Sequence, residues 1–250
     1  MALSQLLMLL CLLVVMVAAL LVARLAQEQQ ERNLVRLYRL AALDQRRAST
    51  RNVIRALLDL DENPEILRIL YQSLKGDLLK IQQLDPTRVD LESDIRQVQS
   101  GLNALADVEK ASPDQLEQRR QRMEQRTSLA SEREIEMTRA YISEAMGTIR
   151  RLYQARQVRG EQLESVARYL GVLSATVAIN SHLNMGTLAL QDGDKINALS
   201  NYRRAENLVM RGPYNGRERA ERMSVIEARK EQLMAQSRSE QGLLLLATAD

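Results

Sequence analysis

The sequence is poor in the residues that build catalytic and metal sites. Its 250 residues include one cysteine, Cys11, and one histidine, His182, so no intrachain disulfide can form. CxxC and HExxH motifs are absent, as are the GxSxG, GxxxxGK[ST] and GxGxxG motifs of nucleophile and phosphate loops. We therefore expect no enzyme activity, no metal and no cofactor. His182 is interpreted as a packing residue rather than a catalytic base.

Large aromatic residues and turn formers are also scarce. The chain has no Trp, no Phe, 7 Tyr, 10 Gly and 4 Pro, so it offers little turn chemistry for sheets. Leu, Ala, Glu, Gln and Arg, which favour helices, are abundant. The composition predicts an all-α fold. With 35 basic and 32 acidic residues the net charge is only +3, and we expect no nucleic-acid partner.

The N-terminal region carries the longest apolar stretch. Leu6 to Ala23 is a run of eighteen apolar residues, which spans about 27 Å as a helix, roughly the thickness of the hydrocarbon core. We predict a transmembrane anchor at residues 3–25 that contacts membrane lipid. A cleaved signal peptide fits less well because the start lacks basic residues and Arg24 stands where small residues are wanted. A lipoprotein needs a small residue before Cys11, where Leu10 stands. A buried core helix is the other alternative, but a run that is apolar on all sides fits lipid better than an amphipathic contact.

Arginines follow the apolar run, and no Lys or Arg precedes it. They are Arg24, Arg32, Arg36, Arg39, Arg46, Arg47, Arg51 and Arg55. Because basic residues stay on the cytoplasmic side, the sequence predicts a single-pass inner-membrane protein with its body in the cytoplasm. A body that faces the periplasm is the alternative. We interpret the arginines as determinants of topology rather than as ligands of lipid headgroups.

Helical periodicity organises the chain after the anchor. A juxtamembrane helix is expected at residues 26–61, with Leu34, Leu37, Leu40 and Ala41 on one stripe. Residues 64–110 predict an antiparallel hairpin, because leucine-rich segments with coiled-coil spacing flank a turn at Asp85 to Thr87. A long polar helix is expected at residues 113–159, opened by Ser112 as its cap. Residues 239–250 form a short leucine-containing tail.

The segment NMGTLALQDGDKINALSNYRRAENL resembles a tetratricopeptide hairpin. Gly186 stands where the first helix of such a repeat needs a small residue, and Gly193 lies in the turn. Ala198, Tyr202 and Ala205 follow with the small, aromatic, small spacing of the second helix. His182, Ala189 and Met210 depart from the family pattern. The resemblance covers one repeat, residues 179–212, within a tetratricopeptide-like region at residues 161–238.

The resemblance implies both packing and partner-binding residues. Gly186, Ala198, Tyr202 and Ala205 would hold the two helices together. The first-helix positions would line a concave surface for a protein partner, and these are Asn180, Leu183, Thr187, Leu190 and Gln191. Because a solenoid needs neighbouring units, flanking helices at Gln162–Val177 and Arg217–Ala235 are expected to cover the single repeat.

Two classes of function are consistent with these features. The first is a membrane-tethered helical adaptor or scaffold that mediates protein–protein interaction at the cytoplasmic face of a membrane. The second is a structural subunit of an envelope assembly that self-associates through its long helices. The first requires a protein partner, and the second requires a further copy of the chain.

Overall fold

The chain folds entirely into helices in the part that the structure describes. The computed structural model describes residues 2–61, 63–108, 122–123 and 125–247, without the side chains of residues 2–15, 17–19 and 236–247. Within these ranges there are seven helices and no strand, so the predicted all-α class is confirmed. The helices are α1 (Ala2–Leu60), α2 (Pro64–Leu84), α3 (Asp90–Val108), α5 (Glu132–Gln154), α6 (Gly160–Gln191), α7 (Lys195–Arg211) and α8 (Gly216–Ala247).

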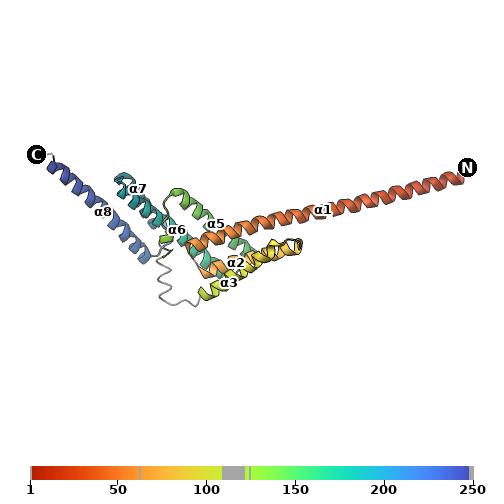
Figure 1. Ribbon diagram of the computed structural model, residues 1–250, viewed down its shortest axis with the longest axis horizontal. Helices are drawn as coiled ribbons and strands as arrows, with labels where there is room; N and C mark the ends of the chain where they lie inside the picture. Colours follow the sequence, from red (N-terminus) through yellow and green to blue (C-terminus); the bar gives the residue numbers. More distant parts are fainter. Residues whose placement is uncertain (1, 62, 109–121, 124, 248–250) are drawn as a thin grey trace.

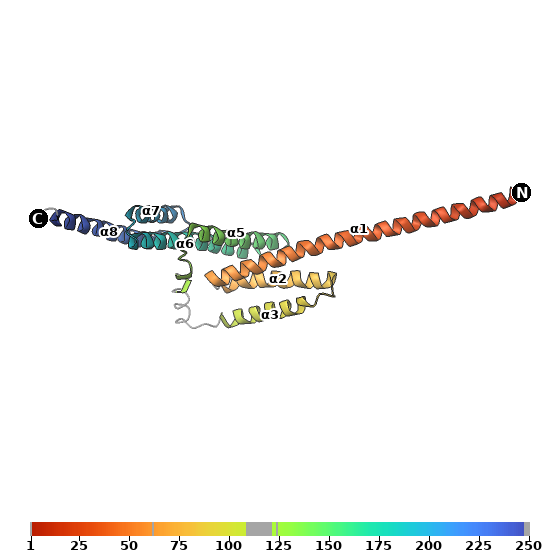
Figure 2. The same cartoon turned by 45° about the horizontal axis from the view of Figure 1, so that its top comes forward.

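The molecule is elongated. Its two longest arms, the start of α1 and the end of α8, project from opposite ends of the central helices (Figure 1). The hairpin of α2 and α3 lies along the last part of α1, and α5, α6 and α7 form a layer beside it (Figure 2). Among the residues whose side chains are described, no helix is long and apolar enough to cross a membrane. Most of the predicted anchor at residues 3–25 lies outside those residues.

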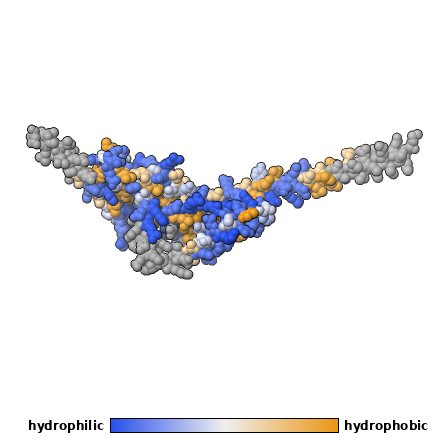
Figure 3. Space-filling view, in the orientation of Figure 1, coloured by the Kyte–Doolittle hydropathy of each residue, from blue (hydrophilic) through white to orange (hydrophobic). Residues whose placement is uncertain are grey.

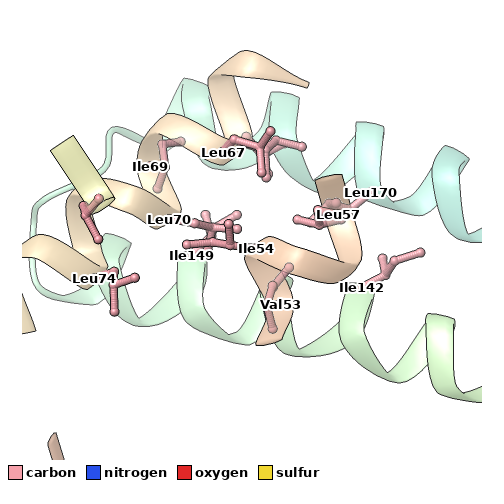
Figure 4. Close-up of a cluster of buried hydrophobic side chains, with 14 of the residues drawn as sticks. Val53, Ile54, Leu57, Leu67, Ile69, Leu70, Leu74, Ile142, Ile149 and Leu170 are labelled. Atoms are coloured by element: carbon pink, nitrogen blue, oxygen red, sulfur yellow. The ribbon is translucent and has the colours of Figure 1, made fainter. Parts of the chain in front are cut away.

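The larger core joins the end of α1 to four other helices. Val53, Ile54 and Leu57 of α1 are at most 4% exposed and pack with residues of α2, α5 and α6 (Figure 4). Their 3.6-residue periodicity puts these side chains on one face of α1, and burying them anchors that helix in the body. Leu91 and Val98 of α3 complete this core.

A second core lies at the other end of α6. Ile179 of α6, Val209 of α7 and Ile226 of α8 are at most 1% exposed and pack together with Tyr214. The first half of α6 contributes Val166, Leu170, Leu173 and Val177 to the larger core. Helix α6 therefore connects the two cores, and it fixes the α7–α8 region relative to α1.

Ion pairs tie α1 to the α2–α3 hairpin. Arg47 donates to Asp90 at 3.1 Å and also contacts Asp94, while Arg51 donates to Asp94 at 2.5 Å. Arg88, in the turn before α3, donates to both carboxylate oxygens of Asp44 at 2.8 Å. Arg47 and Arg51 therefore form ion pairs within the body. The exposed Arg24, Arg32, Arg36 and Arg39 lie nearer the apolar run.

The hairpin begins with a side-chain cap at Asn63. The side-chain oxygen of Asn63 accepts hydrogen bonds from the backbone of Glu65 at 3.1 Å and Ile66 at 3.2 Å. Pro64 occupies the first turn of α2, where a backbone N–H has no partner within the helix, so proline costs no hydrogen bond. Leu91, Val98 and Leu105 of α3 face the core with spacings of seven, as the predicted seam requires.

The long polar helix expected at residues 113–159 is wrong as one continuous helix. Residues 109–121 and 124 lie outside the described residues, and the chain then turns at Thr127–Ala130 before α5 begins at Glu132. Ser131 caps α5 by accepting from the backbone of Glu134 at 3.3 Å. The Glu134 carboxylate accepts from the backbone of Ala130 at 3.1 Å. The side-chain cap of Ser131 starts a new helix.

Two other predicted boundaries also differ from the structure. The covering helix expected at Gln162–Val177 and the first repeat helix are one 32-residue helix, α6. Its sequence has no Pro, and the two interior glycines, Gly171 and Gly186, do not interrupt a helix that is packed along its length. The tail expected at residues 239–250 continues α8 as far as Ala247, and its side chains lie outside the described residues.

Candidate interaction site

The α6–α7 hairpin is built around a tight connection of three residues. Gly193 has φ of +80°, a conformation that favours glycine, and its neighbours are Asp192 and Asp194. The Asp194 carboxylate caps α7 by accepting from the backbone of Asn197 at 3.0 Å and from its side chain at 2.5 Å. These hydrogen bonds lower the pKa of Asp194. The turn therefore sets α7 antiparallel against the second half of α6.

The four residues expected to pack the hairpin are all buried. Ala198 and Ala205 are 0% exposed and Tyr202 is 1% exposed. A Cβ added to Gly186 would lie 2.5 Å from the Cε1 atom of Tyr202. The ring of Tyr202 therefore occupies the space that a side chain at Gly186 would need, and it brings the two helices close together.

The three polar residues of the expected partner surface have different environments. Asn180 is partly buried, and its Nδ2 donates to the Oγ1 of Thr127 at 2.8 Å. Thr187 donates to the backbone oxygen of Leu183 at 2.9 Å, one turn earlier in α6. Gln191 is exposed at the end of the helix. The Asn180 amide is therefore bonded to Thr127, in the turn before α5.

The two leucines of that set face the inside of the hairpin. Leu183 packs against both the Ile179 cluster and the cluster formed by Ala198, Tyr202 and Leu233. Leu190 packs against the second of these clusters. The five expected residues lie within about 100° of arc on one face of α6. On that face Leu183 and Leu190 pack inside the hairpin and Asn180 bonds Thr127, so a concave partner surface formed by all five stays a prediction.

The same region of α6 holds the turn before α5, which sequence reasoning missed. Ser181 is 0% exposed, and its hydroxyl donates to the backbone oxygen of Thr127 at 3.1 Å and accepts from the backbone of Leu129 at 3.0 Å. Asn184 donates to the backbone oxygens of Leu129 at 3.3 Å and Ser128 at 3.4 Å. The signal for this contact is a group of polar residues, Asn180, Ser181 and Asn184, close together in the second half of α6.

A groove of about 470 Å³ runs along the outer face of α7 beside α8. Ile196, which is 84% exposed, and the partly buried Leu199 give it apolar surface, while Leu233, only 7% exposed, forms its floor. Its charged lining, among the described residues, consists of Lys195, Arg203 and Arg204, without a carboxylate. The complete described lining is Lys195, Ile196, Leu199, Ser200, Arg203, Arg204, Asn207 and Leu233. Arg204 also pairs with Glu132 of α5, so this edge of the groove is fixed to the central helices.

His182 lies between the two helices of the hairpin. Its Nδ1 is 3.1 Å from the Oδ1 of Asn201, so the ring links α6 to α7. In the part of the chain that the structure describes, no group of three or more His, Cys, Asp or Glu side chains is placed to hold a metal ion. The open groove on α7 and α8, with apolar surface and basic edges, has the chemistry of a protein-binding surface.

Replacing Gly186 with alanine should destabilise the chain, because the added methyl group displaces the Tyr202 ring. We expect Gly186→Ala to lower the free energy of unfolding by about 1–3 kcal/mol. The matched control is Gly171→Ala in the same helix, where a Cβ meets nothing within 4 Å and should stabilise by about 0.5–1 kcal/mol. Urea unfolding followed by circular dichroism measures both. Equal effects of the two variants would contradict the close contact.

Comparisons with protein-family models, with curated proteins and with solved structures found no match for this chain. The likeness to a tetratricopeptide hairpin therefore rests on the residues and contacts of α6 and α7 alone.

Proposed function

We propose that this chain is a membrane-tethered helical adaptor that mediates protein–protein interaction at the cytoplasmic face of the inner membrane. The observation that carries the proposal is the course of α1. The apolar run Leu6 to Ala23 occupies one end of this 59-residue helix, and the other end is buried in the larger core. An apolar run of that length suits a bilayer, and the burial of Val53 and Leu57 suits a folded body.

The section of α1 between the run and the body acts as a spacer in this proposal. Residues 26–42 extend about 25 Å at the helical rise, and Leu43 is the first buried residue that follows. The positively charged residues near the run are Arg24, Arg32, Arg36 and Arg39, all exposed. They favour a body on the cytoplasmic side.

The groove on α7 and α8 is the partner surface that we propose for the adaptor. It lies at the far end of the molecule from the start of α1, so it would point away from the bilayer (Figure 2). Ile196 and Leu199 suit the apolar face of a helix, while Arg203 and Lys195 suit acidic residues along its edges. An acidic amphipathic helix is therefore the partner that matches this surface.

The alternative function is a structural subunit of an envelope assembly, and the same body facing the periplasm is the alternative location. The observation that favours self-association is the exposed apolar surface on α1, where Leu34 is 53% and Leu37 is 62% exposed. Such surface on a projecting helix favours a second helix as its cover.

The membrane arrangement predicts the behaviour of the whole chain and of a variant that lacks residues 1–26. The whole chain should remain in the membrane pellet after alkaline carbonate extraction, and the shortened variant should not. A C-terminal fluorescent reporter should fluoresce, and a C-terminal alkaline phosphatase should be inactive, because both face the cytoplasm. High phosphatase activity without fluorescence would place the body in the periplasm, and extraction of the whole chain by carbonate would contradict the anchor.

The groove predicts a charge-dependent partner. Ile196→Asp puts a carboxylate on the groove surface, so capture of the partner by detergent-extracted full-length protein should fall at least tenfold. Val225→Asp is the matched control, since Val225 is half exposed on α8 and does not line the groove. Capture should also weaken as salt is raised. If quantitative mass spectrometry finds the same proteins at equal yield with both variants, the groove is not the partner surface.

A further inference from the structure

A segment of α1 that we call the neck, residues 26–42, stands apart from the rest of the fold. Every described residue of the neck is exposed except Leu40, which is partly buried against the larger core. Leu34 is 53%, Leu37 62% and Tyr38 75% exposed. Figure 3 shows apolar residues, in orange, on the part of α1 that projects from the body. Apolar side chains of this size on a lone helix leave a surface that favours a cover.

The neck carries a regular seam. Gln27, Gln30, Leu34, Leu37 and Ala41 follow one another at intervals of 3, 4, 3 and 4 residues, the spacing at which two helices pair along their length. No member of the seam is charged. Glutamine side chains at two seam positions can hydrogen-bond across a pair of helices, and polar seam residues of this kind fix the register.

The arginines of the neck lie on the opposite side, whereas Glu31 flanks the seam next to Gln30. Glu28, Glu31, Arg32, Arg36 and Arg39 line a groove of about 530 Å³ together with Val35 of α1 and Leu84 of α2. Because Leu84 ends the first helix of the hairpin, this charged side is the one that faces the body. The seam residues are not part of the described lining of that groove.

The helical repeat gives the same separation between the seam and the core. Leu34 and Ile54 are twenty residues apart, and so are Leu37 and Leu57. At about 100° per residue, twenty residues are five turns plus about 200°, so the two side chains of each pair point to opposite sides of α1. Ile54 and Leu57 point into the larger core. The seam therefore lies on the far side of α1 from the body, so a second helix can pack along it without meeting the body.

We propose that the neck pairs in parallel with the neck of a second copy of this chain. The inference rests on the proposed membrane anchor, which would insert every copy in the same direction and hold the necks side by side. Self-pairing through an uncharged seam brings no like charges together, because Arg32, Arg36 and Arg39 point away from it. The seam covers about two heptads, which is short for a stable dimer in solution. The anchor would raise the effective concentration of the necks by holding them in one membrane.

Pairing has a consequence for the adaptor. The two bodies would extend from opposite sides of the paired necks, because each body lies on the side of α1 away from the seam. Each dimer would then present two α7–α8 grooves. A partner with two acidic helices would bind both grooves at a high effective concentration.

Disulfide formation between single cysteines tests the pairing in the full-length protein. The native thiol is first removed by Cys11→Ala, and Leu34→Cys or Leu37→Cys is then introduced. Oxidation of isolated native membranes should give a covalent homodimer with either variant, at several times the yield of the control Arg36→Cys. All three positions are exposed in the monomer, so the variants should fold alike.

Equal yields for Leu37→Cys and Arg36→Cys, or no dimer with either seam variant, would overturn the proposal. A covalent product whose mass is that of another protein would also overturn it, because the seam would then bind a different helix. Carbonate extraction of the same membranes reports on the anchor separately. If carbonate extracts the chain but the seam cysteines still cross-link more than Arg36→Cys, the anchor alone is contradicted. If the chain stays in the membrane but all three cysteines cross-link equally, the pairing alone is contradicted.

Discussion

Burial of one end of α1 is the interaction on which the rest of the architecture depends. Val53, Ile54 and Leu57 are almost fully buried among α2, α5 and α6, and ion pairs from Arg47 and Arg51 fix the same helix to the start of α3. The remainder of α1 is a continuous helix that leaves the body as a projecting arm. The body therefore has a fixed direction relative to the apolar run.

Helix α6 connects the core around α1 to the other end of the molecule. Its first half packs in the larger core, and its second half packs against α7 and α8. Its central polar residues, Asn180, Ser181 and Asn184, hold the turn at residues 127–130 through hydrogen bonds. Because one helix takes part in all these contacts, the groove on α7 is positioned by the same packing that holds α1.

The sequence predicts the features that depend on local chemistry. Leucine spacing indicates the helices of the α2–α3 hairpin, Gly193 marks a turn, and Gly186 faces Tyr202 as a small residue should. Features that depend on distant residues could not be predicted. Leu37 and Leu40 share one predicted stripe, and only the position of the body decides that Leu40 is partly buried while Leu37 is exposed. The break before α5 likewise depends on Ser181, 54 residues from Thr127.

The membrane arrangement proposed for this chain requires α1 to be one rigid helix from the apolar run into the core. A distance measurement between spin labels at Gln29→Cys and Asn52→Cys, both exposed, tests it in membranes. The Cys11→Ala background removes the native thiol, and an excess of unlabelled chain removes contributions between copies. A continuous helix predicts a narrow distribution near 35 Å, from about 1.5 Å per residue. A broad distribution at shorter distances would show a hinge between the two labels and contradict a continuous α1.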